Sequence, residues 1–129
     1  MGKKLLFGAI IVLFIGFISF QFMKTTAEVV NISTDELAER LAKGEENTVF
    51  IDVREPDEYE AGHIEGFTNL PLSILDENSA DFPKDADIVI ICRSGNRSME
   101  AAEKLLEFGF KHPINVEGGM IDWAGDIAK

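Results

Sequence analysis

The fold is decided by twelve residues in the second half of the chain: Asp87-Ile88-Val89-Ile90-Ile91-Cys92-Arg93-Ser94-Gly95-Asn96-Arg97-Ser98. Their apolar run, residues 88–91, is typical of a strand buried on both faces of a sheet. Small and polar residues follow and lead into a helical pattern, so the stretch predicts a strand, a turn and the start of a helix. Such a junction aims several free backbone N–H groups into one space, and the helix adds the positive end of its dipole.

Cys92 is the single cysteine of the chain and stands where the predicted strand ends. An anion-binding turn favours the thiolate over the thiol, which makes Cys92 a candidate nucleophile. The alternative is a small apolar residue that fills a strand end, the usual role of a free cysteine. One cysteine allows no internal disulfide, so cysteine usage does not indicate the redox compartment.

Length and charge restrict the partners. The chain has 129 residues, enough for one domain. All 23 acidic residues but only 9 of the 12 basic ones fall within residues 28–129, which gives this part a net charge of −14. No basic stripe is present, so we expect no nucleic-acid partner, and the acidic surface favours solubility. Arg93 and Arg97 are therefore notable as two of the few cations, placed beside the only thiol.

The N-terminus carries an apolar segment. Lys3 and Lys4 precede residues 5–22, which contain no charge. As a helix these 18 residues span about 27 Å, just short of a hydrocarbon core. The segment predicts a single membrane anchor, with the remainder outside the cytoplasm. The alternative is a signal peptide cleaved near residues 25–27, which would release a secreted protein. We expect residues 1–27 to form this anchor or signal segment with a short tether, and residues 28–129 to form the domain.

Strand and helix patterns alternate along the domain. Apolar or extended segments at 29–32, 49–53, 69–72, 87–91 and 114–116 predict strands. Helical signals lie at 33–44, 55–60, 73–77 and 98–108, the first opened by a capping box of Ser33 and Glu36. Leu37, Ala38 and Leu41 of the first helix are expected to face the core. This order predicts an α/β fold, a parallel sheet with helices on both faces. Ligands bind beyond the carboxyl ends of such strands, where Cys92 ends one strand and Asp52 and Arg54 lie at another.

Three motifs together resemble the rhodanese family. The first half of a rhodanese domain is similar to Asp52-Val53-Arg54-Glu55 with Glu58-Tyr59, Gly62-His63-Ile64, Gly66 and Asn69-Leu70-Pro71. The active-site loop of the family resembles residues 92–98. The C-terminal signature of the family is similar to Asn115-Val116-Glu117-Gly118-Gly119-Met120 with Trp123. The resemblance covers about 100 residues, in order and at family spacing.

The resemblance implies a thiosulfate sulfurtransferase without a metal or cofactor. Cys92 would accept sulfur from a small anionic donor such as thiosulfate, become a persulfide, and pass the sulfur to a thiol or protein acceptor. The loop would bind the donor and shape the site through Arg93, Ser94, Gly95, Asn96, Arg97 and Ser98. Asp52 and Arg54 would support the site structurally, although the residues alone also allow a surface ion pair. His63 is expected to bond a backbone group, and the glycines Gly118 and Gly119 to allow close backbone packing.

Other classes of function remain open. Phosphatases of related fold have five residues between cysteine and arginine, whereas this loop has four, residues 93–96, which favours a sulfurtransferase. A sulfur-carrier or redox partner module would load Cys92 but turn over thiosulfate poorly. A non-catalytic binding domain is the third reading, and the intact cysteine with both arginines argues against it. Two scattered histidines and one cysteine do not indicate a metal site.

Overall fold

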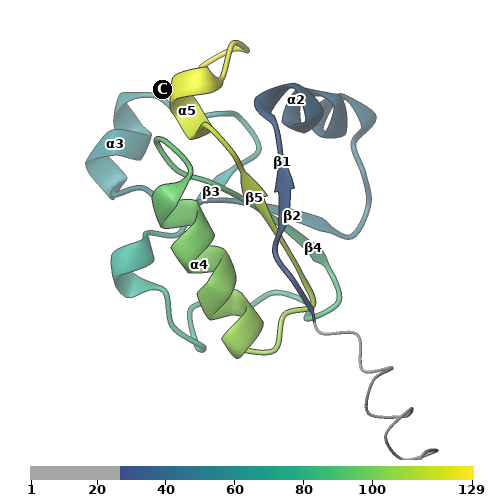
Figure 1. The fold of residues 1–129 in the computed structure, drawn as a ribbon. Helices are drawn as coiled ribbons and strands as arrows, with labels where there is room; N and C mark the ends of the chain where they lie inside the picture. Colours follow the sequence, from purple (N-terminus) through teal and green to yellow (C-terminus); the bar gives the residue numbers. More distant parts are fainter. Residues whose placement is uncertain (1–26) are drawn as a thin grey trace, which may run out of the picture.

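The computed structural model describes residues 27–129 and contains one five-stranded sheet (Figure 1). All neighbouring strands are parallel, in the order β1-β5-β4-β2-β3. The strands are β1 (Val30–Ile32), β2 (Thr48–Asp52), β3 (Thr68–Asn69), β4 (Asp87–Ile91) and β5 (His112–Val116). The predicted α/β fold with a parallel sheet is confirmed.

The predicted anchor or signal segment at residues 5–22 lies outside the described residues. Within residues 27–129, no helix has the length and apolar character needed to span a membrane.

Strand β4 forms the centre of the sheet, between β2 and β5. Ile88 and Ile90 are fully buried in the core on one face, and Val89 and Ile91 in the core on the other. Burying such a side chain stabilises the fold by about 1.5–3 kcal/mol. Burial on both faces of the sheet therefore explains the continuous apolar run, as predicted. Because β4 is fixed in the core, the position of Cys92, which follows it, is fixed as well.

Helices cover both faces of the sheet, as predicted. Helix α4 (Asn96–Glu107) packs Ala101, Ala102 and Leu105 into the core on one face. Helix α2 (Thr34–Lys43) buries Leu37 in the core on the other face. Ser33 caps α2 by accepting a hydrogen bond from the backbone N–H of Glu36, and Gly44 ends it in the left-handed conformation. The expectation from the helical pattern that Ala38 faces the core is wrong, because this residue is exposed.

The short helices lie near the carboxyl ends of the strands or in the connections. They are α3 (Pro56–Ala61), the 3-10 turn η1 (Leu72–Ile74) and α5 (Gly119–Asp122). The helix predicted at 73–77 is only this single 3-10 turn. Helix α4 begins at residue 96, two residues earlier than predicted. The backbone of Gly95, with φ of 103°, turns the chain sharply enough for the helix to start inside the loop.

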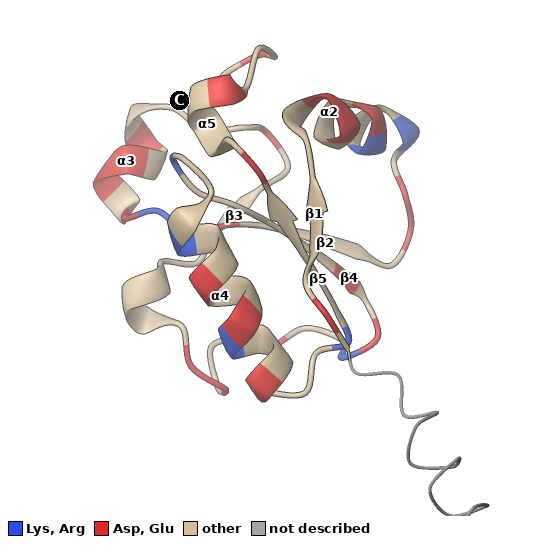
Figure 2. Cartoon of the chain, in the orientation of Figure 1, with Lys and Arg blue, Asp and Glu red and all other residues tan. Residues whose placement is uncertain are grey.

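Charge is distributed unevenly over this framework. Acidic residues dominate α3 and recur on α2 and α4, whereas basic residues are few (Figure 2). Helix α3 lies next to the loop that precedes α4, and Glu58 of α3 pairs with Arg97 at the start of α4. The acidic helix thus meets one of the two cations beside Cys92.

Candidate active site

Cys92 follows β4 directly, and the loop after it curls around the sulfur. The backbone N–H of Gly95 donates to the Cys92 Sγ at 3.0 Å. The Ser98 Oγ, from the first turn of α4, lies 3.3 Å from the same sulfur. Cys92 and Ser98 are both buried. The predicted strand, turn and helix junction therefore brings a backbone N–H and a hydroxyl to one buried sulfur.

The surroundings of Cys92 have opposing effects on its ionisation. Burial disfavours the thiolate, whereas hydrogen bonds from Ser98, from Gly95 and from the backbone of Ser94 favour it. The hydrogen bonds prevail, so the pKa of the Cys92 thiol is lowered from its ordinary value. A lowered thiol pKa at a strand–loop–helix junction is typical of a reactive cysteine.

Two backbone hydrogen bonds from helix α5 hold the backbone of Cys92 and Arg93 in place. The N–H of Met120 donates to the Cys92 carbonyl at 2.9 Å, and the N–H of Ile121 to the Arg93 carbonyl at 3.0 Å. This contact is possible because Gly119 has no side chain: a Cβ there would lie 2.4 Å from the Cys92 carbonyl oxygen. Gly118 and Gly119 both have positive φ, 77° and 52°. The expected close backbone packing is confirmed for Gly119, whereas at Gly118 a Cβ would meet the Asp122 side chain.

Arg97 is held by a glutamate from α3. Its guanidinium donates to both carboxylate oxygens of Glu58, at 2.6 and 2.9 Å. This pair is the main reason that the pKa of Glu58 falls to about 2, and it raises the pKa of Arg97. Both side chains are about one-third exposed. Arg97 therefore ties the loop to α3, and its predicted part in binding the donor stays a prediction.

The outer side of the loop is open to solvent. Arg93, Ser94 and Asn96 are exposed, and Gly95 is half-buried. Among the described residues, the Arg93 side chain makes no hydrogen bond or ion pair. Its guanidinium is thus available to an anion that approaches the loop.

Asp52 and Arg54 form a buried ion pair, so the reading of a surface pair is wrong. The Asp52 side chain is fully buried and that of Arg54 is 8% exposed. Arg54 donates to Asp52 through Nε and through Nη2, the latter at 2.7 Å, and its guanidinium also reaches the carbonyls of Glu58 and Gly62. The pair is buried because β2 ends beneath α3. It holds α3, and with it Glu58, against the sheet.

Three residues near the site, Glu58, Asn115 and Asn31, have no role that the sequence predicts. Glu58 was part of a family motif, but only the fold places it opposite Arg97. Asn115 on β5 accepts a hydrogen bond from the Ser98 hydroxyl at 2.5 Å, and Asn31 on β1 accepts one from Asn115 at 3.1 Å. A polar residue within the apolar strand β5 was the available signal for Asn115. His63, by contrast, bonds the Tyr59 carbonyl with its Nδ1 at 2.9 Å, as predicted.

Comparison with known proteins identifies the family. The family model described as "Rhodanese-like domain" matches residues 33–126. The Bacillus subtilis protein named "Putative sulfurtransferase YtwF" is 40% identical over 99 residues, covering 77% of this chain and 94% of that protein. An Allochromatium vinosum protein named "Sulfurtransferase" is 38% identical over 96 residues, covering 74% and 89%. The crystal structure of a rhodanese-like domain protein from Staphylococcus aureus superposes with a TM-score of 0.67 at 34% identity, covering 75% and 92%. The chain belongs to the rhodanese family.

Proposed function

We propose that this chain is a sulfurtransferase that carries sulfane sulfur as a persulfide on Cys92. The Cys92 thiolate attacks the outer sulfur of the donor, and the bond between the two donor sulfurs breaks. With thiosulfate as donor, sulfite leaves with the electron pair of that bond, and Cys92 becomes an anionic persulfide. A thiolate acceptor then attacks the outer persulfide sulfur, takes it, and returns Cys92 to the thiolate.

The observation that carries this proposal is the convergence of donors on the Cys92 sulfur. The N–H of Gly95 points at Sγ, Ser98 lies on the other side, and α4 starts just beyond. These groups stabilise a sulfur anion without a metal, and they do so for the thiolate and for the persulfide alike. The sequences of relatives named as sulfurtransferases support the same chemistry.

Thiosulfate is the donor that we propose, and an external thiol or a protein is the acceptor. Arg93 supports an anionic donor, because its exposed guanidinium stands on the solvent side of the loop in a strongly acidic domain. An external acceptor follows from the presence of one cysteine, since no second thiol of the chain can take the sulfur.

The deciding experiment is the intact mass of the full chain before and after incubation with thiosulfate, with Cys92→Ser treated in parallel. We expect the wild type to gain one sulfur atom that a reducing thiol removes, and the serine variant to gain none. No gain in a folded wild type with a free thiol would refute thiosulfate as donor. If sulfur is gained but small thiols release it only slowly, the chain is a carrier for a dedicated protein instead. A serine variant that still gains sulfur would refute Cys92 as the nucleophile.

We propose further that residues 5–22 hold the domain at a membrane, with the domain outside the cytoplasm. The support is the uncharged run of 18 residues behind Lys3 and Lys4. Membrane fractionation combined with the intact mass of the N-terminus tests this. A full-length chain in the membrane fraction is the expected result. A soluble chain that begins near residue 28 would indicate a cleaved signal peptide.

A further inference from the structure

A chain of hydrogen bonds runs from the Cys92 sulfur to the edge of the sheet. Cys92 lies beside Ser98, the Ser98 hydroxyl donates to the Oδ1 of Asn115, and the Nδ2 of Asn115 donates to the Oδ1 of Asn31. The first three residues are buried and Asn31 is exposed. We name these four residues the Cys92–Asn31 relay. It connects α4, β5 and β1 to the thiol.

The relay has a direction, because Ser98 has only one hydroxyl hydrogen. In the arrangement observed, that hydrogen points to Asn115, so Ser98 can only accept a hydrogen bond from Cys92. This direction suits a neutral thiol, whose S–H is a donor. A thiolate needs the opposite direction: Ser98 donates to sulfur, Asn115 donates to Ser98 through Nδ2, and Asn31 donates to Asn115. Every buried polar atom stays satisfied in both directions.

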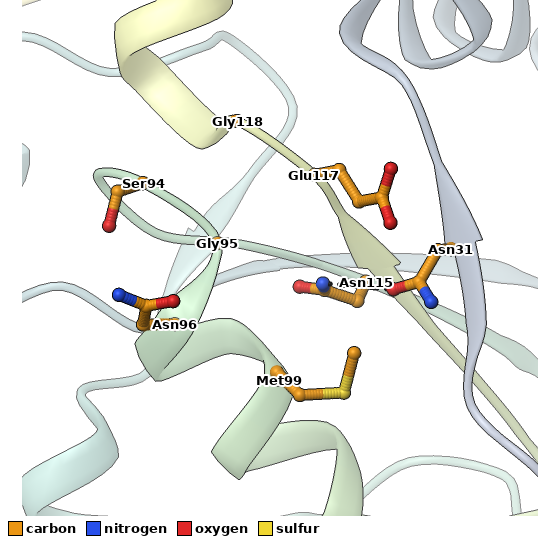
Figure 3. A pocket seen from close by; sticks show the side chains of 8 residues that line it. All are labelled: Asn31, Ser94, Gly95, Asn96, Met99, Asn115, Glu117 and Gly118. Atoms are coloured by element: carbon orange, nitrogen blue, oxygen red, sulfur yellow. Dashed lines mark hydrogen bonds between the residues drawn. The ribbon is translucent and has the colours of Figure 1, made fainter.

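The surroundings allow the two amides to turn. Asn31 and Asn115 approach each other from β1 and β5 and line an open pocket of about 260 Å³ with Met99 and Glu117 (Figure 3). Exchanging the oxygen and nitrogen of an asparagine amide changes the shape of the side chain very little. Since Asn31 reaches solvent, its turn costs no buried hydrogen bond.

We propose that Asn115 is a positioning residue that controls the direction of the Ser98 hydroxyl, and that the Asn115 and Asn31 amides turn together when Cys92 loses its proton. The backbone N–H of Gly95 donates to the sulfur in both states, whereas Ser98 does so only in the ionised one. This inference deepens the proposed function and rests on it for its catalytic meaning.

Charged groups near the site act on Cys92 independently of the relay, and the test must separate their effect from hydrogen-bond direction. They come from every element packed around the loop. The residues are Arg97 on α4, Glu58 on α3, Asp52 at the end of β2, Arg54 after it, Arg93 in the loop, Glu117 after β5 and Asp122 on α5. A comparison of variants with and without the Ser98 hydroxyl keeps all of these groups constant.

The experiment measures the alkylation rate of the full chain with iodoacetamide against pH, and every signal comes from Cys92 because it is the only cysteine. Ser98→Ala should raise the Cys92 pKa by about one unit, a tenfold loss of thiolate at a given pH below it. Asn115→Asp fixes an acceptor opposite Ser98 and should raise the pKa at least as much. Asn115→Leu removes the competing acceptor, frees the hydroxyl for the sulfur, and should leave the pKa unchanged or lower it.

The decisive comparison repeats Asn115→Asp in the Ser98→Ala background. We expect most of its effect to disappear there, leaving only the repulsion by the added charge. An equal shift in both backgrounds, or a rise in pKa for both Asn115→Asp and Asn115→Leu, would overturn the inference. Should the buried Asn115 variants fail to fold, the exposed Asn31→Asp gives the same test, because it holds the Asn115 amide in the observed direction.

The alkylation profile needs no sulfur donor, so the two proposals fail separately. A chain that gains sulfur from thiosulfate but shows the wrong pattern of pKa values refutes the relay alone. A chain that shows the expected pattern and gains no sulfur from thiosulfate or another sulfane donor refutes the proposed function alone.

Discussion

Two neighbouring parallel strands end at the same edge of the sheet, and each is followed by buried polar residues. At the end of β2, the Asp52 carboxylate meets the Arg54 guanidinium, and Asn69 bonds the backbone carbonyls of both residues. At the end of β4, the Cys92 sulfur meets the backbone N–H of Gly95 and the Ser98 hydroxyl. The first group is an ion pair whose charges cancel. The second is a set of donors around an atom that gains a charge when it ionises.

The comparison shows why position alone does not identify a catalytic residue. Both strand ends satisfy the rule that ligands bind beyond the carboxyl ends of parallel strands. Among the described residues, the Asp52 carboxylate accepts hydrogen bonds only from Arg54. Arg54 in turn bonds the carbonyls of Glu58 and Gly62, so this strand end fixes the fold. The Cys92 sulfur has hydrogen-bond partners, and the strength of these hydrogen bonds depends on whether Cys92 is a thiol or a thiolate. The kind of partner around the side chain, more than burial, separates the proposed reactive strand end from the structural one.

The largest effect is expected at the β2 end. Arg54→Met leaves the carboxylate of Asp52 buried without its partner, and we expect a loss of about 3–5 kcal/mol in the free energy of unfolding. Urea denaturation measures this. The control is Arg40→Met, which removes the partly exposed pairs with Glu45 and Asp87 and should cost less than about 1 kcal/mol. Equal losses for the two variants would mean that the buried pair is not the structural anchor described here.

A smaller effect is expected at the contact that holds the β4 end. Gly119→Ala places a Cβ against the Cys92 carbonyl, whereas Gly109→Ala, also at positive φ, meets nothing within 4 Å. Both should lose about 1–2 kcal/mol because alanine resists that backbone conformation. Gly119→Ala should lose further free energy of unfolding because its Cβ meets the backbone of Cys92 and Arg93. It alone should also change the alkylation rate of Cys92. If Gly109→Ala alters that rate equally, the contact with α5 does not position the cysteine.

The smallest effect concerns the Glu58–Arg97 pair that joins the two regions. The lowered pKa of Glu58 means that its contribution is complete above the ordinary carboxyl value of 4.5 and is lost as the pH falls through about 2. Because the pair is one-third exposed, solvent screening limits this contribution to about 1 kcal/mol.

Glu58→Gln should therefore lower the free energy of unfolding at pH 5 and flatten its decline between pH 4.5 and 2. Urea titrations at several pH values measure the decline, with the exposed Glu100→Gln on α4 as the control. A decline as steep in Glu58→Gln as in the wild type and the control would show that the pair does not stabilise the fold.

The order of elements and the position of the nucleophile candidate can be predicted from the amino-acid sequence alone. The apolar run before Cys92 indicates a buried strand, and the alternation of strands and helices implies a parallel sheet. Ser33 and Gly44 mark the ends of a helix through local bonds. These features depend on neighbours in sequence, or on a burial pattern that repeats over a few residues, so they can be read directly from the chain. Even here the weak local signals misled: the helix predicted at 73–77 is a single 3-10 turn, and Ala38, expected in the core, is exposed.

Which residues distant in sequence meet is visible only in the tertiary structure. Glu58 reaches Arg97 across 39 positions, and Asn31 reaches Asn115 across 84. The tertiary structure also decided that Asp52 and Arg54 are buried, because α3 covers the end of β2. Long-range contacts depend on how the sheet is ordered and how helices pack on it, and no local pattern encodes these distances. The chemistry of Cys92 could thus be anticipated from its loop, while the network proposed to control its proton became visible only once β1 and β5 lay side by side.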